Sequence, residues 1–119
     1  MAIKLKRIYD EPSRTDGVRI LVDRLWPRGL TKEDAAIDEW IRDIAPSGNL
    51  RKWFGHKVER WPEFQRRYKK ELKQAQNKQI LQKLARISGI ATVTLLYAAK
   101  DSDRNNAVVL AAVLKSSRK

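Results

Sequence analysis

The stretch TVTLLY, residues 92 to 97, carries the strongest β-strand signal in the chain, because β-branched and aromatic residues are enriched in strands. A second run, VRILV at residues 18 to 22, is almost wholly apolar. Both runs are typical of central strands in a parallel sheet that is covered on both faces. Residues Ile3 to Arg7 alternate apolar and basic side chains, which predicts a third, half-exposed strand.

The chain between the strand at 18 to 22 and the strand at 92 to 97 is predicted to form helices. Thr31 is a suitable N-cap, the apolar residues from Ile37 to Ile44 recur at helical spacing, and Pro46 stops the run. Ser47 can then cap a short helix that ends at Gly55. We therefore expect one helix up to Pro46 and a second, shorter helix directly after it.

Three further helices are expected from apolar spacing and capping residues. Trp61, Phe64, Tyr68 and Leu72 form one apolar stripe, with Pro62 in the first turn, where its missing N–H costs little. The next helix carries the apolar residues of 80 to 87 and ends at Gly89. Ser102 or Asp103 is expected to cap the last helix, residues 107 to 114, which is apolar enough to be buried.

The length and the order of these elements predict one small domain. A chain of 119 residues with 42% hydrophobic content can bury one core. The order strand, strand, helices, strand, helix is typical of an α/β fold with right-handed crossovers. We expect a single α/β domain over residues 1–119, with a mostly parallel sheet of three strands, or slightly more, flanked by helices. The basic tail at 115–119 is expected to fray.

The composition excludes several classes of site. The chain has no cysteine and one histidine, His56, so disulfides, thiolate chemistry, cysteine-bound zinc and histidine-rich metal sites are excluded. No metal and no cofactor is therefore expected, and no phosphate-binding glycine loop is present. No apolar run reaches 18 residues and the N-terminus lacks a signal peptide, so we expect a cytoplasmic bacterial protein that does not enter a membrane.

Charged side chains follow two of the predicted strands at the point where each strand ends. Asp23, Arg24, Trp26 and Arg28 follow residue 22, and Lys100 and Asp101 follow the strand at 92 to 97. In open α/β sheets, ligands bind beyond the carboxyl ends of the strands. If the two strands are neighbours, these loops form a pocket for a phosphate or a nucleotide-like anion, with backbone amides near Asn105 as further donors. The alternative is a structural corner in which the charges pair with one another.

The net charge of +12 is concentrated in one segment. Residues 50 to 88 contain twelve Lys or Arg and three Glu, which predicts an attraction for polyanions. Nonspecific nucleic-acid binding through the basic face of residues 57–73 is therefore an alternative function. The aromatic residues of the helix at 61 to 72 fall on one stripe and the cations mostly opposite, which is also typical of a core-packed helix with a solvated face. The candidate nucleic-acid contacts are Arg66, Lys69, Lys70 and Lys73.

His56 is the candidate for acid–base catalysis, because its unperturbed pKa is the nearest to neutrality of any side chain in the chain. A small hydrolase or transferase that uses His56 is thus a further alternative. A Ser47–His56 dyad is disfavoured, since Ser47 is a good helix N-cap and His56 follows a C-capping glycine.

Four stretches together resemble the YeaO-like bacterial proteins, the short branch of domain-of-unknown-function family 488. They are RILVDRLWPRG (19 to 29), APSGNLRKWFGH (45 to 56), WPEFQRRYKKEL (61 to 72) and LLYAAKDSDRNNAVVLA (95 to 111). The resemblance implies a single small α/β domain and brings no particular activity with it. It adds Arg51, Trp53 and Asn105 to the candidate ligand-binding residues.

Two departures from the family pattern bear on catalysis. Many relatives have a histidine where this chain has Asn106, and longer relatives have a cysteine at the position of Tyr97. The longer relatives also carry a Cys-His-Arg triplet in the loop that follows. The resemblance therefore implies anion binding more strongly than catalysis through the last loop.

Overall fold

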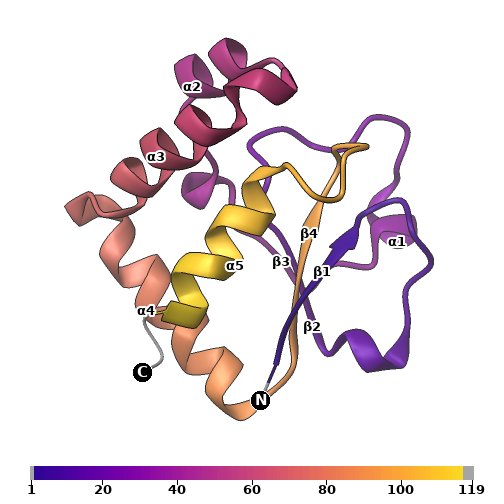
Figure 1. Ribbon diagram of the computed structural model, residues 1–119. Coiled ribbons are helices and arrows are strands. Elements are labelled where there is room, and N and C mark those ends of the chain that lie inside the picture. The colour runs from indigo at the N-terminus through magenta and orange to yellow at the C-terminus, as the bar shows by residue number, and fades with distance from the viewer. Residues whose placement is uncertain (1, 117–119) are drawn as a thin grey trace.

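A computed structural model describes residues 2–116 (Figure 1). Over these residues the chain forms the strands β1 (Ile3–Arg7), β2 (Val18–Leu21), β3 (Glu39–Trp40) and β4 (Val93–Tyr97). The helices are α1 (Lys32–Ala35), α2 (Gly48–Phe54), α3 (Trp61–Leu72), α4 (Ala75–Ile90) and α5 (Asn106–Ser116). Short 3-10 turns lie at Arg14–Asp16, Arg42–Ile44 and Val58–Arg60.

All strand pairs of the described sheet are parallel, in the order β1-β4-β2-β3. The predicted α/β class and parallel sheet are confirmed, with a fourth, two-residue strand added at one edge. The sheet is covered on both faces (Figure 1). On one face α5 packs against β1 and β4 and separates them from α3 and α4. On the other face Leu21 and Leu96 pack with Ile8 and Ala35 in a smaller apolar cluster.

The predicted helix from Thr31 to Pro46 is wrong beyond its first turn. Thr31 does cap α1, but the helix ends at Ala35, and its C-cap, Ala36, adopts a left-handed φ of 49°. The chain then forms β3, which pairs with β2. Helical spacing of the apolar residues from Ile37 to Ile44 misled the prediction, because Ile41 and Ile44 are buried, and Ile37 and Trp40 half-buried, by contacts with distant segments.

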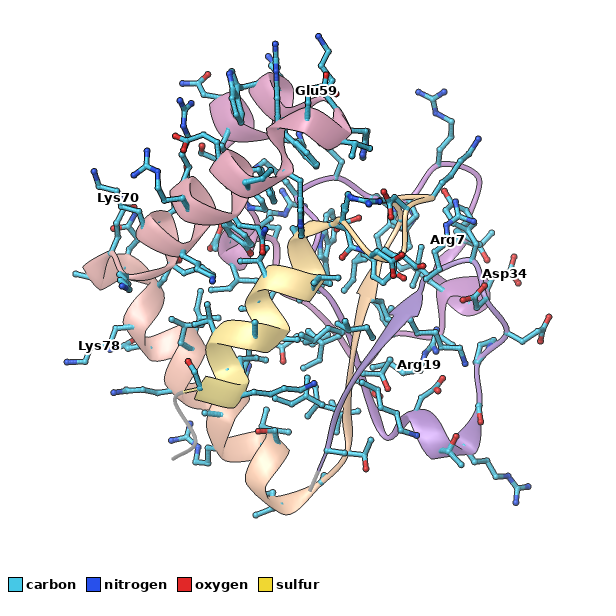
Figure 2. All side chains as sticks on the ribbon, viewed as in Figure 1. Arg7, Arg19, Asp34, Glu59, Lys70 and Lys78 are labelled. Carbon is cyan, nitrogen blue, oxygen red and sulfur yellow. The ribbon has the colours of Figure 1, made fainter. Side chains whose placement is uncertain are left out.

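The buried guanidinium of Arg19, on β2, stabilises the early end of α1. Its Nη2 donates to the carbonyl of Ala35 at 2.9 Å and its Nε to the carbonyl of Ala36 at 2.8 Å. Its Nη1 forms an ion pair with Asp16 at 2.6 Å. The last carbonyls of α1 thus receive donors from another element, as buried carbonyls require. Figure 2 shows Arg19 between the strands and α1.

The predicted helices between residues 47 and 90 are confirmed. Ser47 caps α2 by accepting the N–H of Leu50, and Gly55 ends α2 in the left-handed conformation. The apolar stripe of α3 faces the core, where Phe64, Tyr68 and Leu72 are buried. The helix α4 ends at Ile90, so Gly89 lies inside it, in its last turn.

The cap of the last helix differs from the prediction. Asn105, and neither Ser102 nor Asp103, accepts the N–H of Val108 at 3.1 Å through its side chain. Asp101 accepts the N–H of Asp103 and of Arg104, which turns the loop before the helix starts. Lys115 and Ser116 are the last described residues of α5. The fraying expected at 115–119 stays a prediction, and residues 117–119 lie outside the described residues.

No helix of residues 2–116 is long and apolar enough to cross a membrane.

Candidate functional sites

The carboxyl ends of β1, β4 and β2 lie at the same edge of the sheet, because these neighbouring strands are parallel. Two hydrogen bonds join the segment after β2 to the segment after β4. The N–H of Ala98 donates to Asp23 Oδ2 at 2.9 Å, and Asn106 Nδ2 donates to the carbonyl of Val22 at 2.9 Å. The structure therefore brings Asp23 of the first loop to the second loop and to the start of α5.

Asp23 is the least solvated acid of this edge. Burial raises the pKa of its carboxyl above the usual value, although the hydrogen bonds from Ala98 and Asn106 and the charge of His56 oppose the effect. The carbonyl of Asp23 also accepts a hydrogen bond from Trp40 Nε1 at 2.7 Å. Asp23 is thus a half-buried acceptor that organises the two loops.

The other corner residues have different surroundings. Arg24 donates through Nε to the carbonyl of Pro46 at 3.0 Å and through Nη2 to that of Ala45 at 3.4 Å. Trp26 donates to the carbonyl of Leu30 at 2.8 Å and packs edge-on against Trp40. The guanidinium of Arg24 and the indole of Trp26 therefore serve the fold, whereas Arg28 is exposed.

The second loop uses its own acid to satisfy its amides. Asp101 Oδ1 accepts the N–H groups of Asp103 at 2.9 Å and Arg104 at 3.1 Å, and Oδ2 pairs with the Arg104 side chain at 3.2 Å. Asn105 is buried and donates to the carbonyl of Asp101 at 2.9 Å. Lys100 is exposed. Two of the amides expected to receive a ligand anion thus already have an acceptor within the chain.

Sequence reasoning missed Arg7 and Tyr9, which follow β1 at the same edge. Arg7 Nε donates to the carbonyls of Ala98 at 3.2 Å and Ala99 at 3.0 Å, and its guanidinium lies 4.7 Å from the centre of the Tyr9 ring. The Tyr9 hydroxyl donates to the carbonyl of Arg28 at 2.7 Å. The Arg7-Ile8-Tyr9 sequence at a predicted strand end was the signal, but it needed the position of β1 beside β4.

Tyr97 and Asn106, the two departures from the family pattern, both lie at this edge. Tyr97 is buried, and burial raises the pKa of its phenol, with Asp10 as a further cause. The Asn106 amide connects the first residue of α5 to the end of β2 through Val22. The Asn106 side chain therefore stabilises the junction between sheet and helix.

The remaining candidate ligand-binding and catalytic residues lie on α2 or directly after it. Arg51 is an exposed residue of α2, and His56 is exposed in a left-handed conformation with a φ of 60°. The Ser47 hydroxyl donates to Glu71 Oε2 at 2.7 Å, and the Ser47 N–H donates to Glu71 Oε1 at 2.8 Å. The Ser47 hydroxyl thus donates its hydrogen bond to Glu71, whereas a Ser–His dyad would need it to donate to His56.

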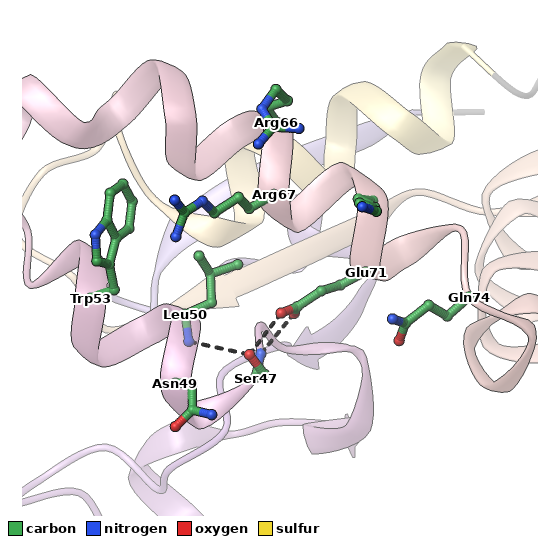
Figure 3. A pocket seen from close by; sticks show the side chains of 9 residues that line it. Ser47, Asn49, Leu50, Trp53, Arg66, Arg67, Glu71 and Gln74 are labelled. Atoms are coloured by element: carbon green, nitrogen blue, oxygen red, sulfur yellow. Dashed lines mark hydrogen bonds between the residues drawn. The ribbon is translucent and has the colours of Figure 1, made fainter.

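Trp53 lies in an open groove of about 590 Å³ between α2 and α3. Figure 3 shows Arg67 of α3 reaching across this groove toward Trp53 of α2. The guanidinium of Arg67 lies 4.3 Å from the centre of the Trp53 ring, and that of Arg60 lies 5.1 Å from it. The residues that line the groove are Ser47, Asn49, Leu50, Trp53, Arg66, Arg67, Lys70, Glu71 and Gln74.

Glu63 holds the two arginines of the groove in place. It accepts from Arg66 Nε at 2.9 Å, from Arg66 Nη2 at 2.6 Å and from Arg67 Nε at 2.7 Å. These hydrogen bonds, those from Arg66 foremost, lower the pKa of the Glu63 carboxyl to about 2. Glu63 is therefore ionised at neutral pH and orients both guanidinium groups on the surface of α3.

The exposed face of α3 carries the predicted nucleic-acid contacts. Arg66, Lys69, Lys70 and Lys73 are all exposed, opposite the buried stripe of Phe64, Tyr68 and Leu72. Figure 2 shows Lys70 pointing away from the body of the protein. We name the residues Trp53, Arg66, Arg67, Lys69, Lys70 and Lys73 the α2–α3 basic face.

No group of three or more His, Asp or Glu side chains among residues 2–116 is placed to hold a metal ion.

Comparison with known proteins gives relatives over almost the whole chain. It is 48% identical to the uncharacterized protein YeaO of Escherichia coli strain K12 over 116 residues, which cover 98% of this chain and 99% of that protein. It is 38% identical over 112 residues to the uncharacterized proteins Mb3100c of Mycobacterium bovis and Rv3073c of Mycobacterium tuberculosis H37Rv, covering 94% of this chain and 92% of each relative. No solved structure matches.

The family model that matches residues 2–119 is DUF488-N3i, described as the inactive DUF488-N3 subclade. This match and the YeaO relative confirm the resemblance that the four sequence stretches indicated. The chain belongs to this subclade of the DUF488 family.

Proposed function

We propose that the protein binds nucleic acid through phosphate contacts made by the α2–α3 basic face. The observation that carries the proposal is the concentration of charge: residues 50 to 88 hold twelve Lys or Arg against three Glu. Glu63 and Glu71 already accept several hydrogen bonds from neighbouring residues. Because these two carboxylates are already engaged, the exposed lysines of the α2–α3 basic face are the groups available to phosphate.

The strand-end residues favour α3 over the sheet edge as the binding site, because several donors at the sheet edge are already used within the chain. The guanidinium of Arg24 donates to backbone carbonyls, and Asp101 occupies two loop amides. Both interactions remove donors that an anion at the sheet edge would need. The description of the subclade as inactive further favours a binding protein over an enzyme.

A salt series tests the proposal. Fluorescence anisotropy with a labelled 15-nucleotide DNA, single-stranded or duplex, gives the dissociation constant at several salt concentrations. Affinity should fall steeply with salt, and a triple charge reversal, Lys69→Glu, Lys70→Glu and Lys73→Glu, should flatten the slope of log K against log salt by about 2 to 3 for the duplex.

The matched control reverses three exposed cations elsewhere: Arg14→Glu, Lys32→Glu and Lys115→Glu. Both triple variants change the net charge equally, so a specific face predicts a large loss only for the α3 variant. Equal losses in the two variants, or binding of wild type that does not respond to salt, would reject the proposal.

A second candidate is a small anion at the sheet edge, held by Arg28 and Lys100. The observation that favours it is the 2.9 Å hydrogen bond from Ala98 to Asp23, which joins the two loops that carry these exposed cations. Calorimetric titration with inorganic phosphate tests it, since an Arg28→Ala, Lys100→Ala variant should lose the heat of binding. Acid–base catalysis by His56 stays a prediction, to be tested by the pH profile of a His56→Ala variant once a substrate is known.

A further inference from the structure

The groove between α2 and α3 combines cations with an aromatic ring. Trp53 is half-buried on one wall, and Arg66, Arg67 and Lys70 are on the other. Proteins that bind single-stranded nucleic acid pair a positive groove, which follows the phosphates, with aromatic side chains on which bases stack. A duplex keeps its bases stacked inside and would use only the cations.

We infer that the preferred ligand of the α2–α3 basic face is a single strand of nucleic acid, with one base stacked on Trp53 and the adjacent phosphate bound by Arg67 and Lys70. The inference rests on the proposed function and adds the class of nucleic acid. The groove volume of about 590 Å³ lies within the range of roughly 300 to 1,000 Å³ that is usual for small-ligand sites. It is thus large enough for a nucleotide unit.

Arg67 occupies the place of the base in the free protein. Its guanidinium lies 4.3 Å from the centre of the Trp53 ring, and its Nε donates to Glu63 at 2.7 Å. Among the described residues its two terminal amino groups make no hydrogen bond, so they are available to a phosphate oxygen. When the strand binds, Arg67 turns from the ring to the phosphate and the base takes its place on the indole. One cation–π contact is exchanged for one stacking contact and a charge-assisted hydrogen bond.

The polar ends of the groove fit a ligand of variable base sequence. Asn49 and Gln74 line it, and each side-chain amide has both a donor and an acceptor. Such groups can pair with the edge of any base. We therefore expect weak sequence preference, as stacking on an aromatic ring also implies.

The test compares a labelled 15-nucleotide single strand with its duplex at one salt concentration, using full-length protein. Wild type should bind the single strand more tightly. Trp53→Leu, which keeps an apolar side chain but removes the ring, should weaken single-strand binding by roughly 5- to 150-fold, as expected for one lost base stack, and change duplex binding less than twofold.

Two controls separate stacking from folding and from charge. Trp53→Phe keeps an aromatic face and should retain much of the single-strand preference, and circular dichroism establishes that both variants fold. Arg42→Ala removes the same kind of contact on another ring, because Arg42 lies 4.1 Å from the centre of the Trp40 ring outside the groove. It should leave the ratio of the two affinities unchanged.

The possible failures are distinguishable. If wild type binds both probes equally and Trp53→Leu weakens neither or both alike, the inference is overturned, while the α3 charge reversal still tests the proposed function. If wild type binds neither probe, both are rejected. If Trp53→Phe is as weak as Trp53→Leu in folded protein, stacking is not the source of the preference, and the inference is again overturned.

Discussion

The ion pair of Asp16 with Arg19 predicts a large loss of stability in an Asp16→Asn variant. The two side chains are 5% and 6% exposed, and Oδ2 of Asp16 lies 2.6 Å from Arg19 Nη1. Asp16 also accepts from Lys6 at 3.2 Å and from the N–H of Ser13 at 2.9 Å. The substitution removes the charge while it keeps the size of the side chain.

The magnitude follows from burial. Removing one partner of a buried ion pair costs about 3 to 5 kcal/mol, because the remaining charge is left desolvated without its counterion. In a domain of this size, 1 kcal/mol shifts the melting temperature by about 4 °C. We therefore expect the melting temperature of Asp16→Asn to fall by about 12 to 20 °C at neutral pH. Arg19 keeps its hydrogen bonds to Ala35 and Ala36, which places the loss toward the lower end of that range.

The loss should depend on pH in a direction that the pKa of Asp16 determines. Burial by itself raises that pKa, but the hydrogen bonds from Ser13, Lys6 and Arg19 outweigh it, so the pKa is lowered. A lowered pKa of an acid stabilises the folded state above the pKa of the unfolded chain, about 3.9, and this contribution is lost as the pH falls through the folded value. The difference between wild type and Asp16→Asn should thus be constant from pH 5 to 8 and shrink below pH 4.

Thermal unfolding followed by circular dichroism at pH 7 and pH 3 measures both effects. Asp34→Asn, at an exposed acid of α1, is the matched control and should change the melting temperature by no more than a few degrees. A loss in Asp16→Asn below about 1 kcal/mol, or one of the same size at both pH values, would refute the reasoning.

Three further predictions concern the effect of single substitutions on stability. Gly17→Ala should cost more than about 2 kcal/mol, because φ is +64° and a Cβ would lie 2.2 Å from the carbonyl oxygen of Thr92, whereas Gly48→Ala meets nothing within 4 Å and should be neutral or gain up to about 1 kcal/mol in urea unfolding. Tyr68→Phe should lose about 1 to 3 kcal/mol in the same assay, since the buried hydroxyl donates to the carbonyl of Ile44 at 2.6 Å; a loss near zero would contradict this. Asp23→Asn should become more stable relative to wild type as the pH rises through the raised pKa of Asp23, because ionisation of that desolvated carboxyl opposes folding; an advantage that is greatest at low pH would contradict the assignment.

Several elements could be predicted because their signals are local. The strand predicted at 92 to 97 is rich in β-branched and aromatic residues, and the one predicted at Ile3 to Arg7 alternates apolar and basic side chains. The structure has them at Val93–Tyr97 and at Ile3–Arg7. Ser47 and Gly55 marked both ends of α2 through their capping preferences. The stripe of α3 predicted which of its faces is buried, since a helix presents every third or fourth residue to the same side.

The functional sites could be predicted only in part. Sequence placed Arg28 and Lys100 at strand ends and concentrated positive charge around α3. It did not show that the guanidinium of Arg24 would turn to the carbonyls of Pro46 and Ala45. That outcome depends on how closely the loop after β2 approaches the segment before α2, which no local pattern reports.

By itself, the sequence determined the elements with regular apolar spacing, the helix caps of α2, the family and the sign and position of the excess charge. The tertiary structure decided which residues meet. Arg19 stabilises the end of α1 after one turn, β1 brings Arg7 beside the loop after β4, and the packing of α2 on α3 places Arg67 over Trp53. The physical reason is that propensity and periodicity act over a few neighbouring residues, whereas these contacts join segments that only the packed core brings together.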